Sequence, residues 1–459
     1  MRTFKRGVHP GGHKGLSKNE PIRKVLPAEQ VMYPLVQHIG APAVPIVKKG
    51  DRVLVGQPIA EAGSFVSVPI HSAVSGTVKA VEPRLTAAGR EIETIVIDND
   101  GQYTPVDGFG VERDWRNATP EEIVDVVQKA GIVGLGGAGF PTHVKLRPKD
   151  PAAIHTVIVN GVECEPYLTC DYRLMLEKTD DLLIAIDLLL RLFPNARAVI
   201  GIEDNKPLAI RKLRDATAAT ERIGVCALKT KYPQGGERML IHAVTGEDIN
   251  STVLPMDAGC VVENVASVLA IGDAVRFGVP LISRVMTVTG DAVASACNLH
   301  VAIGDSYSHV LEAAGGFAIE PQKIITGGPM TGTAMFDLNV PIVKTSASIL
   351  ALTEDEVAQQ KTTACIHCGH CVRSCPEFLV PQMMYRSVLA DDFEQFEKLH
   401  GMECIECGCC TYSCPAKLPL AQAFKYAKLE VAKKRRAQKA AEAAKAAEEK
   451  TGEKGGAAS

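Results

Sequence analysis

Residues 365–376 read CIHCGHCVRSCP and residues 404–415 read CIECGCCTYSCP, so one cysteine pattern occurs twice near the C-terminus. Each copy has the spacing C-x2-C-x2-C-x3-C-P, in which three thiolates hold one [4Fe–4S] cluster and the fourth reaches a second cluster. A tight loop supplies three convergent sulfurs, and the next turn of chain points the fourth cysteine away. We expect one cluster on Cys365, Cys368, Cys371 and Cys414, and the other on Cys404, Cys407, Cys410 and Cys375.

Structural zinc is the alternative interpretation of these cysteines. Zinc usually takes two C-x2-C pairs or includes histidines, and it gives no reason for a proline after the fourth cysteine of both runs. Cys409 lies between two expected ligands and is not itself counted as one. Cys226, Cys260 and Cys297 have apolar neighbours and are expected in the core.

Composition narrows the class of protein further. The formal net charge of −3 predicts no general affinity for nucleic acid. Residues 1–6 lack the apolar core of a secretory signal, and cluster cysteines must stay reduced, so both features favour the cytoplasm. The longest apolar run, residues 182–192, is interrupted by Asp187 and is shorter than the roughly eighteen residues that a membrane span needs.

The first hundred residues are expected to be all-β. Short apolar runs at 53–55, 66–70, 77–81 and 92–97 alternate with glycine-containing turns. The phrases VKKGDRVLVGQPIAE and IHSAVSGTVKAVE are similar to lipoyl or biotinyl carrier domains. A carrier needs a lysine at the hairpin tip, and residues 61–75 contain none. We therefore expect a structural or docking role.

Helical and strand patterns alternate from about residue 119, where Thr119 and Glu122 form a capping box around Pro120. After this helix comes a loop with Gly134, Gly136, Gly137 and Gly139, then Pro141 and Lys145. Its G-x-G-x-x-G spacing is not an ordinary dinucleotide fingerprint, because a helix precedes it and a proline follows it. The loop either wraps a phosphate or flavin, with Lys145 adding positive charge, or is a simple turn.

Polar residues also follow a buried strand predicted at 156–159. Asn160, Glu163 and Glu165 come after it, where α/β sheets bind ligands, and their side chains suit ribose hydroxyls or an amide. Solvated loop acids are the alternative. Residues 232–237, YPQGGE, open a helix that runs to about residue 244, and its N-terminus is a natural anion site.

Four stretches together resemble the C subunit of Rnf complexes, the membrane-associated ferredoxin:NAD oxidoreductases. They are RGVHPGGHK (6–14), GLGGAGFPTHVKL (134–146), VNGVECEPYLTCDYRLM (159–175) and YPQGGERMLIHAVTG (232–246). The resemblance covers nearly the whole chain. The central part is similar, more distantly, to the flavoprotein subunit of respiratory complex I, which binds FMN noncovalently and takes a hydride from NADH.

The resemblance implies roles for individual residues. The glycines of the loop and Lys145 match the flavin loop, while Asn160, Glu163 and Glu165 match an element beside flavin and nicotinamide, with the two glutamates as catalytic candidates. Further cofactor contacts are implied for Tyr232, Gly235, Glu237 and Asn264. The chain departs from complex I at Leu135, Val162 and Arg238, where the first two replace an arginine and an aspartate.

We expect a multidomain α/β and α+β chain. The domains are a β-rich lipoyl-like barrel-sandwich domain (1–105), an α/β domain for FMN and NADH (116–275), a small β-grasp domain (278–345) implied by the resemblance, an α-helical two-cluster ferredoxin-like domain (355–430), and a basic, alanine-rich tail (431–459). The tail is expected to be a solvated helix fraying into disorder. Its basic start, residues 425–436, suits anionic lipid, an acidic partner or simple solubility.

The resemblance implies a peripheral subunit on the cytoplasmic face of the membrane that passes electrons between NAD(H), FMN and two [4Fe–4S] clusters. Its partners would be the other subunits of an ion-translocating complex and, through them, ferredoxin. Two alternatives share some of these motifs: a flavin and iron–sulfur cobalamin reductase, and an electron-relay subunit that binds clusters but no flavin.

Overall fold

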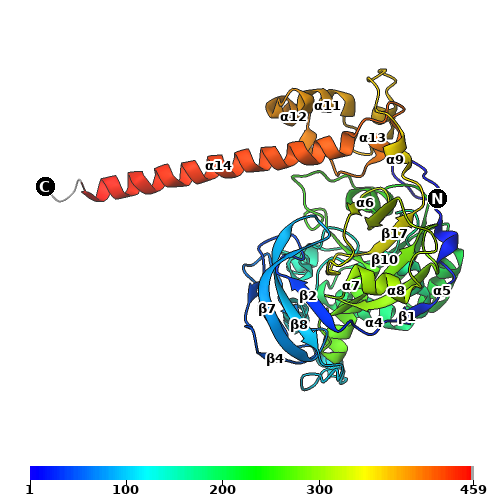
Figure 1. The fold of residues 1–459 in the computed structure, drawn as a ribbon, viewed down its shortest axis with the longest axis vertical. Helices are drawn as coiled ribbons and strands as arrows, with labels where there is room; N and C mark the ends of the chain where they lie inside the picture. The colour runs from blue at the N-terminus through cyan, green and yellow to red at the C-terminus, as the bar shows by residue number, and fades with distance from the viewer. Residues whose placement is uncertain (456–459) are drawn as a thin grey trace. The chain divides into compact units, whose positions relative to one another are not determined.

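The computed structural model describes residues 1–455, which form two compact units (Figure 1). The large unit contains residues 1–4 and 9–356, and the C-terminal unit contains residues 5–8 and the chain from Val357 onward. No helix within residues 1–455 has the length and hydropathy that a bilayer crossing requires.

The N-terminal region of the large unit is built from β-strands, as predicted. One sheet has the order β2 (Gln30–Pro34), β8 (Glu91–Asn99), β7 (Gly76–Leu85), β4 (Arg52–Val53), and a second has the order β3 (Val44–Pro45), β5 (Pro58–Glu61), β6 (Ile70–His71). Gly76 begins β7 where a Cβ would lie 2.0 Å from the Asp98 carbonyl oxygen, so only glycine allows this close pairing with β8. Alternating residues such as Ile95 and Ile97 of β8 are fully buried in the core.

A four-stranded parallel sheet forms the centre of the large unit. Its order is β11 (Ile223–Leu228), β10 (Arg197–Glu203), β9 (Thr156–Asn160), β12 (Cys260–Asn264). Successive residues of β9 face opposite sides: Val157 and Val159 join one apolar cluster, and Ile158 joins another. Both faces are therefore covered, which explains why the strand sequence is apolar without alternation.

Helices cover the two faces of this sheet. The connecting helices are α1 (Pro120–Lys129), α2 (Thr142–Lys145), α3 (Cys170–Glu177), α4 (Thr179–Leu192), α5 (Pro207–Thr217), α6 (Glu237–Thr245) and α7 (Val265–Phe277). The predicted capping box of α1 is present, with Thr119 accepting from the Glu122 amide and Glu122 accepting from the Thr119 amide. Leu240 and Ile241 of α6 pack on the face that carries Ile158.

A six-stranded sheet follows in the order β1 (Ile22–Lys24), β14 (Cys297–Ala302), β13 (Ser283–Thr289), β17 (Ser348–Leu352), β15 (Lys323–Thr326), β16 (Thr333–Met335), with α8 (Tyr307–Ala313) joining β14 to β15. Strand β1 comes from the N-terminal segment and pairs in parallel with β14. The sheet thus includes β1 and β17, which lie outside the range 278–345 expected for this domain. Pairing between distant segments leaves no local signal in the sequence.

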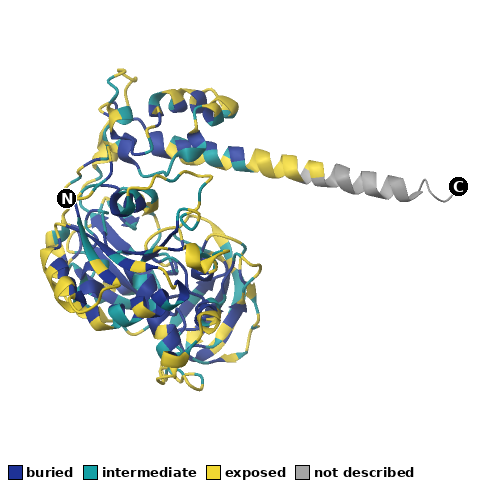
Figure 2. Ribbon diagram, turned by 180° about the vertical axis from the view of Figure 1, so that it is seen from behind, coloured by how far each residue is buried: buried dark blue, intermediate teal, exposed yellow. Residues whose placement is uncertain are grey.

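The C-terminal unit is helical. It contains α10 (His370–Ser374), α11 (Pro381–Leu389), α12 (Phe393–Lys398), α13 (Cys409–Tyr412) and α14 (Leu420–Gly455), and α9 (Glu356–Gln359) begins at its boundary. Residues 5–8 join this unit: the Arg6 guanidinium lies 4.1 Å from the Phe378 ring centroid, and the Gly7 amide donates to the Ser374 carbonyl. Figure 2 shows α14 passing from buried to exposed residues along its length.

The basic start of α14 is largely paired with acids of its own unit. Lys434 contacts Glu394 at 2.8 Å, and Arg435 contacts Glu397 at 2.5 Å. These partners lie on α12, so much of the positive charge is already balanced inside the unit. The expected helical tail is present as far as Gly455, and residues 456–459 lie outside the described residues.

We predict that deleting residues 437–459 leaves the C-terminal unit folded. Val431 is the last residue of α14 in its apolar core, so the free energy of unfolding should change by less than about 0.5 kcal/mol. By contrast, Phe424→Ala removes a fully buried ring and should cost about 3–5 kcal/mol. Denaturant unfolding of the two variants measures both effects. A cost from the deletion comparable to that of Phe424→Ala would show that the tail is part of the fold.

Candidate functional site

The predicted flavin residues meet at the carboxyl ends of β9 and β12. Asn160 and Asn264 are the last residues of these strands and are paired in the parallel register. Asn160 Nδ2 donates to the Gly235 carbonyl at 2.9 Å, which ties the YPQGGE segment to the sheet. Asn264 caps α7 by accepting from the Ala266 amide at 2.8 Å. The strand ends thus bring together residues separated by about a hundred positions, as the geometry of parallel sheets requires.

The glycine loop lies directly over Asn264. A Cβ on Gly136 would lie 2.7 Å from Asn264 Nδ2, so no side chain fits between the loop and the sheet end. A Cβ on Gly137 would meet nothing within 4 Å, whereas one on Gly139, whose φ is +72°, would lie 2.5 Å from Thr345. Gly134 closes the loop through its amide, which donates to the Phe140 carbonyl at 2.9 Å. The loop therefore presents bare backbone on one side and packs tightly on the other.

Lys145 lies among carboxylates. Its Nζ donates to the Val262 carbonyl at 3.0 Å and lies 3.8 Å from Glu263 and 3.7 Å from Glu237. Burial lowers the pKa of Lys145, but the two carboxylates outweigh burial and hold this pKa above its ordinary value. Glu237, in the first turn of α6, is thus brought next to Lys145.

Glu263 is a residue of this site that the sequence analysis missed. Its side chain is fully buried, and neither carboxyl oxygen has a hydrogen-bond partner within the protein. Burial raises the pKa of Glu263 to about 7, against the opposing effect of Lys145. The available signal was an acid inside the apolar stretch that forms β12. Two unpartnered buried oxygens beside a bare glycine backbone fit a ligand rich in N–H and O–H donors, such as the ring and ribityl chain of FMN.

The loop after β9 carries the two predicted catalytic glutamates. Glu163 Oε1 accepts from the Asp171 amide at 2.7 Å, and Glu163 Oε2 lies 3.8 Å from Lys14 Nζ. Burial raises the pKa of Glu163 to about 7, while Lys14 and Lys206 act in the opposite direction. Asp171, which accepts from Asn264 Nδ2 at 2.7 Å, links this loop to the flavin element.

Glu165 is held by a loop of the six-stranded sheet. Its carboxylate accepts from the amides of Met330 at 3.1 Å and Thr331 at 3.0 Å, and from the Thr331 hydroxyl. A Cβ on Gly328 would lie 2.2 Å from Glu165 Oε2, so this glycine permits a close approach as well as a turn. Burial raises the pKa of Glu165, and these hydrogen bonds act to lower it. Glu165 therefore links the loop after β9 of the parallel sheet to the loop after β15 of the six-stranded sheet. Both of its carboxylate oxygens already accept hydrogen bonds.

The remaining predicted contacts lie on the same side of the sheet. Tyr232 is buried, and the Gly235 amide donates to Cys164 Sγ at 3.4 Å. Cys164 lies within the loop that carries both glutamates, so the segment 232–237 and this loop support each other. Two groups of contacts result. Hydrogen bonds connect Asn160, Gly235 and the glutamate loop into the first group. Ion pairs connect Lys145 with Glu237 and Glu263 in the second.

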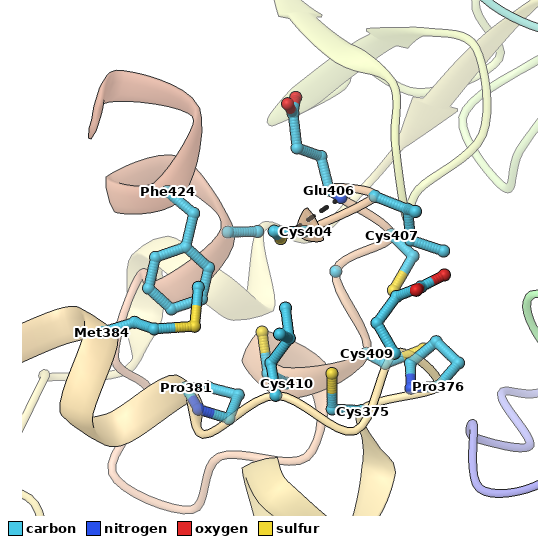
Figure 3. A pocket seen from close by; sticks show the side chains of 15 residues that line it. Cys375, Pro376, Pro381, Met384, Cys404, Glu406, Cys407, Cys409, Cys410 and Phe424 are labelled. Carbon is cyan, nitrogen blue, oxygen red and sulfur yellow. Dashed lines mark hydrogen bonds between the residues drawn. The ribbon is translucent and has the colours of Figure 1, made fainter. Parts of the chain in front are cut away.

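The eight cysteines of the two runs surround two cavities in the C-terminal unit. Cys375, Cys404, Cys407 and Cys410 line one cavity together with Pro381, Met384 and Phe424 (Figure 3). Cys365, Cys368, Cys371 and Cys414 line the other. Of these eight pattern cysteines, each cavity thus receives three from one run and the fourth from the other run. This is the arrangement that crossed ligation of two [4Fe–4S] clusters needs, and the donor set is all sulfur.

The two cysteine runs fold in the same way. His367 and Glu406 occupy equivalent positions with φ of 54° and 57°, and Gly369 and Gly408 follow with φ of 72° and 77°. These left-handed residues turn each loop around its three sulfurs before a short helix begins. Burial raises the pKa of the Cys404 thiol to about 12. Cys409, fully buried, also lines the first cavity.

Comparison with family models divides the chain into three matched parts. Residues 2–102 match the RnfC barrel sandwich hybrid domain, residues 127–273 the Nuo51 FMN-binding domain, and residues 358–415 a 4Fe-4S dicluster domain. Together with the fold, these matches define an iron–sulfur flavoprotein of electron transport.

Relatives along most of the chain identify the family. The chain is 43% identical to the C subunit of the proton-translocating ferredoxin:NAD(+) oxidoreductase complex of Clostridium ljungdahlii, over 84% of each chain. It is 42% identical to the C subunit of the Na(+)-translocating complex of Acetobacterium woodii, over 95% of this chain and 98% of that one. For the C subunit of the ion-translocating oxidoreductase complex of Rhodobacter capsulatus the identity is 42%, over 93% and 82%. The chain belongs to the family of Rnf complex C subunits.

A solved structure is also similar. An NAD+-reducing [NiFe]-hydrogenase in the H2-reduced state aligns with a TM-score of 0.49 and 19% identity, over 71% of this chain and 67% of the hydrogenase chain.

We predict that Cys375→Ser removes the cluster expected on the second cysteine run. The serine takes a ligand from the cavity that Cys404, Cys407 and Cys410 line, so about four of the irons should be lost. EPR of the reduced protein and iron analysis measure this loss. Cys226→Ser, on β11 and outside both runs, is the matched control and should keep all the iron. Loss of the signal from the cluster on Cys365, Cys368 and Cys371 instead would contradict crossed ligation.

We predict that Gly137→Arg abolishes flavin binding while both clusters remain. A Cβ at Gly137 meets no atom within 4 Å, so the protein should fold, but the arginine would extend over the bare face of the loop. The control is Gly224→Arg on β11, where a Cβ is equally unobstructed. Flavin is measured by absorbance after acid extraction, and iron is measured in the same sample. Normal FMN occupancy in Gly137→Arg would remove the glycine loop from the flavin site.

Proposed function

We propose that this chain is the NAD(H)-oxidising and NAD(H)-reducing subunit of a membrane-bound ferredoxin:NAD oxidoreductase complex that couples electron transfer to ion translocation. One observation carries the proposal: a single chain combines a glycine-backed site at the ends of β9 and β12 with two cavities, each lined by four cysteines of the repeated C-x2-C-x2-C-x3-C pattern. FMN exchanges a hydride with a nicotinamide and single electrons with iron–sulfur clusters, so it is the cofactor that this combination requires.

In this proposal the flavin lies against the backbone of Gly134, Gly136 and Gly137. Glu263 would accept hydrogen bonds from it, since both of its oxygens lack partners in the protein. Asn160 and Asn264 hold the strand ends on which the site is built. A site walled by glycine on one side leaves the opposite flavin face for a nicotinamide.

The two glutamates have different parts in the proposal. Glu163, with a buried and unbonded Oε2, is the side chain whose charge can respond to a bound nicotinamide. Glu165 keeps the neighbouring loop in place through Met330 and Thr331. We propose four residues as contacts of NAD(H): Glu163, Glu165, Tyr232 and Glu237.

The cysteines are proposed as cluster ligands in two crossed sets. Cys365, Cys368, Cys371 and Cys414 would hold one [4Fe–4S] cluster, and Cys404, Cys407, Cys410 and Cys375 the other. Cys375, Cys410 and Cys414 are buried whereas Cys365 is exposed, and such differences in burial tune the reduction potentials of clusters.

The other subunits of the complex would be the direct partners, with ferredoxin reached through them. We place the chain at the cytoplasmic face of the membrane as a peripheral subunit. Washing membranes with high salt or urea tests this: the chain should be released without detergent. Retention until detergent is added would argue against a peripheral attachment.

The decisive experiment is anaerobic purification followed by FMN and iron analysis and titration with NADH. We expect about one FMN and about eight irons per chain, with NADH bleaching both flavin and cluster absorbance. Eight irons without flavin or any response to NADH would indicate a two-cluster relay. Bleaching by NADH followed by rapid electron transfer to added cobalamin would favour a cobalamin reductase.

A further inference from the structure

The N-terminal segment lies against the loop that carries Glu163 and Glu165. The Tyr167 amide donates to the Gly12 carbonyl at 2.8 Å, and the rings of His13 and Tyr167 stack with centroids 4.6 Å apart and an interplanar angle of 9°. Farther along, the hydroxyls of Ser17 and Thr169 lie 2.7 Å apart. A segment from the start of the chain therefore contacts the loop from Tyr167 to Thr169.

This loop needs support from outside. Residues 161–169 form neither helix nor strand, and Glu163 and Tyr167 have φ of 49° and 70°. Such left-handed conformations are unfavourable for residues other than glycine and persist only where the surroundings impose them. The local sequence therefore does not fix the orientation of Glu163.

Lys14 supplies much of that support. Its Nζ donates to the Glu165 carbonyl at 2.9 Å and to the Leu168 carbonyl at 2.5 Å, and it lies 3.8 Å from Glu163 Oε2. One ammonium group thus contacts the loop backbone at two points and the carboxylate at a third. The Lys14 side chain is only 13% exposed, and that of Glu163 only 3%, so water screens this pair weakly.

Among the described residues, the other charged groups near Glu163 form no ion pair with its carboxylate, although Lys206 donates to the Glu163 backbone carbonyl at 3.5 Å. Lys206 donates to the Val162 carbonyl at 2.6 Å and to Asn205 Oδ1 at 3.0 Å, and it pairs with Glu203 at 3.5 Å. On α3, Cys170 and Asp171 place their ligand atoms within 4.8 Å of the Glu163 carboxylate. The titratable and charged groups that face Glu163 are therefore Lys14, Lys206 with its partner Glu203, Cys170 and Asp171. Only Lys14 forms an ion pair with Glu163 among the described residues.

We propose that Lys14 is a positioning residue of the hydride-transfer site, holding Glu163 and its loop in the geometry that nicotinamide and flavin require. The inference rests on the proposed function. It gives the N-terminal segment a part in the redox site, because Lys14 reaches a loop 151 positions away in the sequence.

The ion pair has a consequence for pH dependence. Burial raises the pKa of Glu163 to about 7, and the Lys14 ammonium opposes that rise. Lys14→Met removes the opposing charge, so the pKa of Glu163 should rise further and its carboxylate should ionise only at higher pH. A charge at this distance typically shifts a carboxyl pKa by about one unit or more.

The test measures the rate of NADH-driven flavin bleaching from pH 6 to 9 in single-turnover, anaerobic stopped-flow experiments on the complete chain. We expect Lys14→Met to retain FMN and iron. In the plot of bleaching rate against pH, the limb that reports the ionisation of Glu163 should move upward by about one pH unit. Glu163→Gln should abolish that limb, and Lys14→Met in the Glu163→Gln background should cause no further shift. Lys212→Met, which removes another lysine that donates to a backbone carbonyl, should leave the profile unchanged.

Two results would overturn the proposal: a wild-type pH profile in Lys14→Met, or an equal shift in the Glu163→Gln background. If Lys14→Met fails to fold, Glu163→Gln alone decides, since an unchanged limb in that variant would also overturn it. Failure of the proposed function is distinguishable, because the wild-type protein would then contain no flavin or show no bleaching by NADH.

Discussion

The parallel pairing of β12 with β9 is the constraint on which the site depends. It places Asn264 beside Asn160, and every other part of the site is arranged around these two strand ends. Gly136 must be glycine because Asn264 lies against it, and Asp171 is oriented by the Asn264 amide. A shift of β12 by one residue against β9 would turn Asn264 to the opposite face of the sheet and separate it from Asn160.

Buried charge is the second organising feature. Three acids and three lysines lie close to the carboxyl ends of the parallel strands and form ion pairs there. They are Glu163 with Lys14, Glu263 with Lys145, and Glu203 with Lys206. Such groups are costly to bury unless they are paired. Glu263 lies 3.8 Å from Lys145, but neither of its carboxyl oxygens has a hydrogen bond within the protein. A buried acid without hydrogen bonds costs stability, and ligand sites commonly carry such a cost.

Local patterns predicted the parts of this structure that depend on neighbouring residues. The cysteine spacing predicted two four-sulfur groups because a loop of fixed length determines which sulfurs converge. The capping box predicted the start of α1 because Thr119 and Glu122 are three residues apart. The α/β centre and the β-rich N-terminal region were likewise predicted from alternating apolar runs and turns.

Long-range contacts are the parts that one sequence cannot predict. Lys14 reaches Glu165 across 151 positions, and β1 joins a sheet whose other strands begin at Ser283. The basic start of α14 suited anionic lipid, an acidic partner or simple solubility, and in the structure Lys434 and Arg435 pair with Glu394 and Glu397 on α12. Each of these outcomes depends on which distant segment the fold brings near, and that is a property of tertiary packing.

The N-terminal segment shows how such contacts extend a site beyond its sequence motifs. Residues 1–4 run beside the end of β11, where Lys231 donates to the Phe4 carbonyl, residues 5–8 pack within the C-terminal unit, and residues 12–17 lie on the glutamate loop. One short stretch of chain therefore belongs to both units.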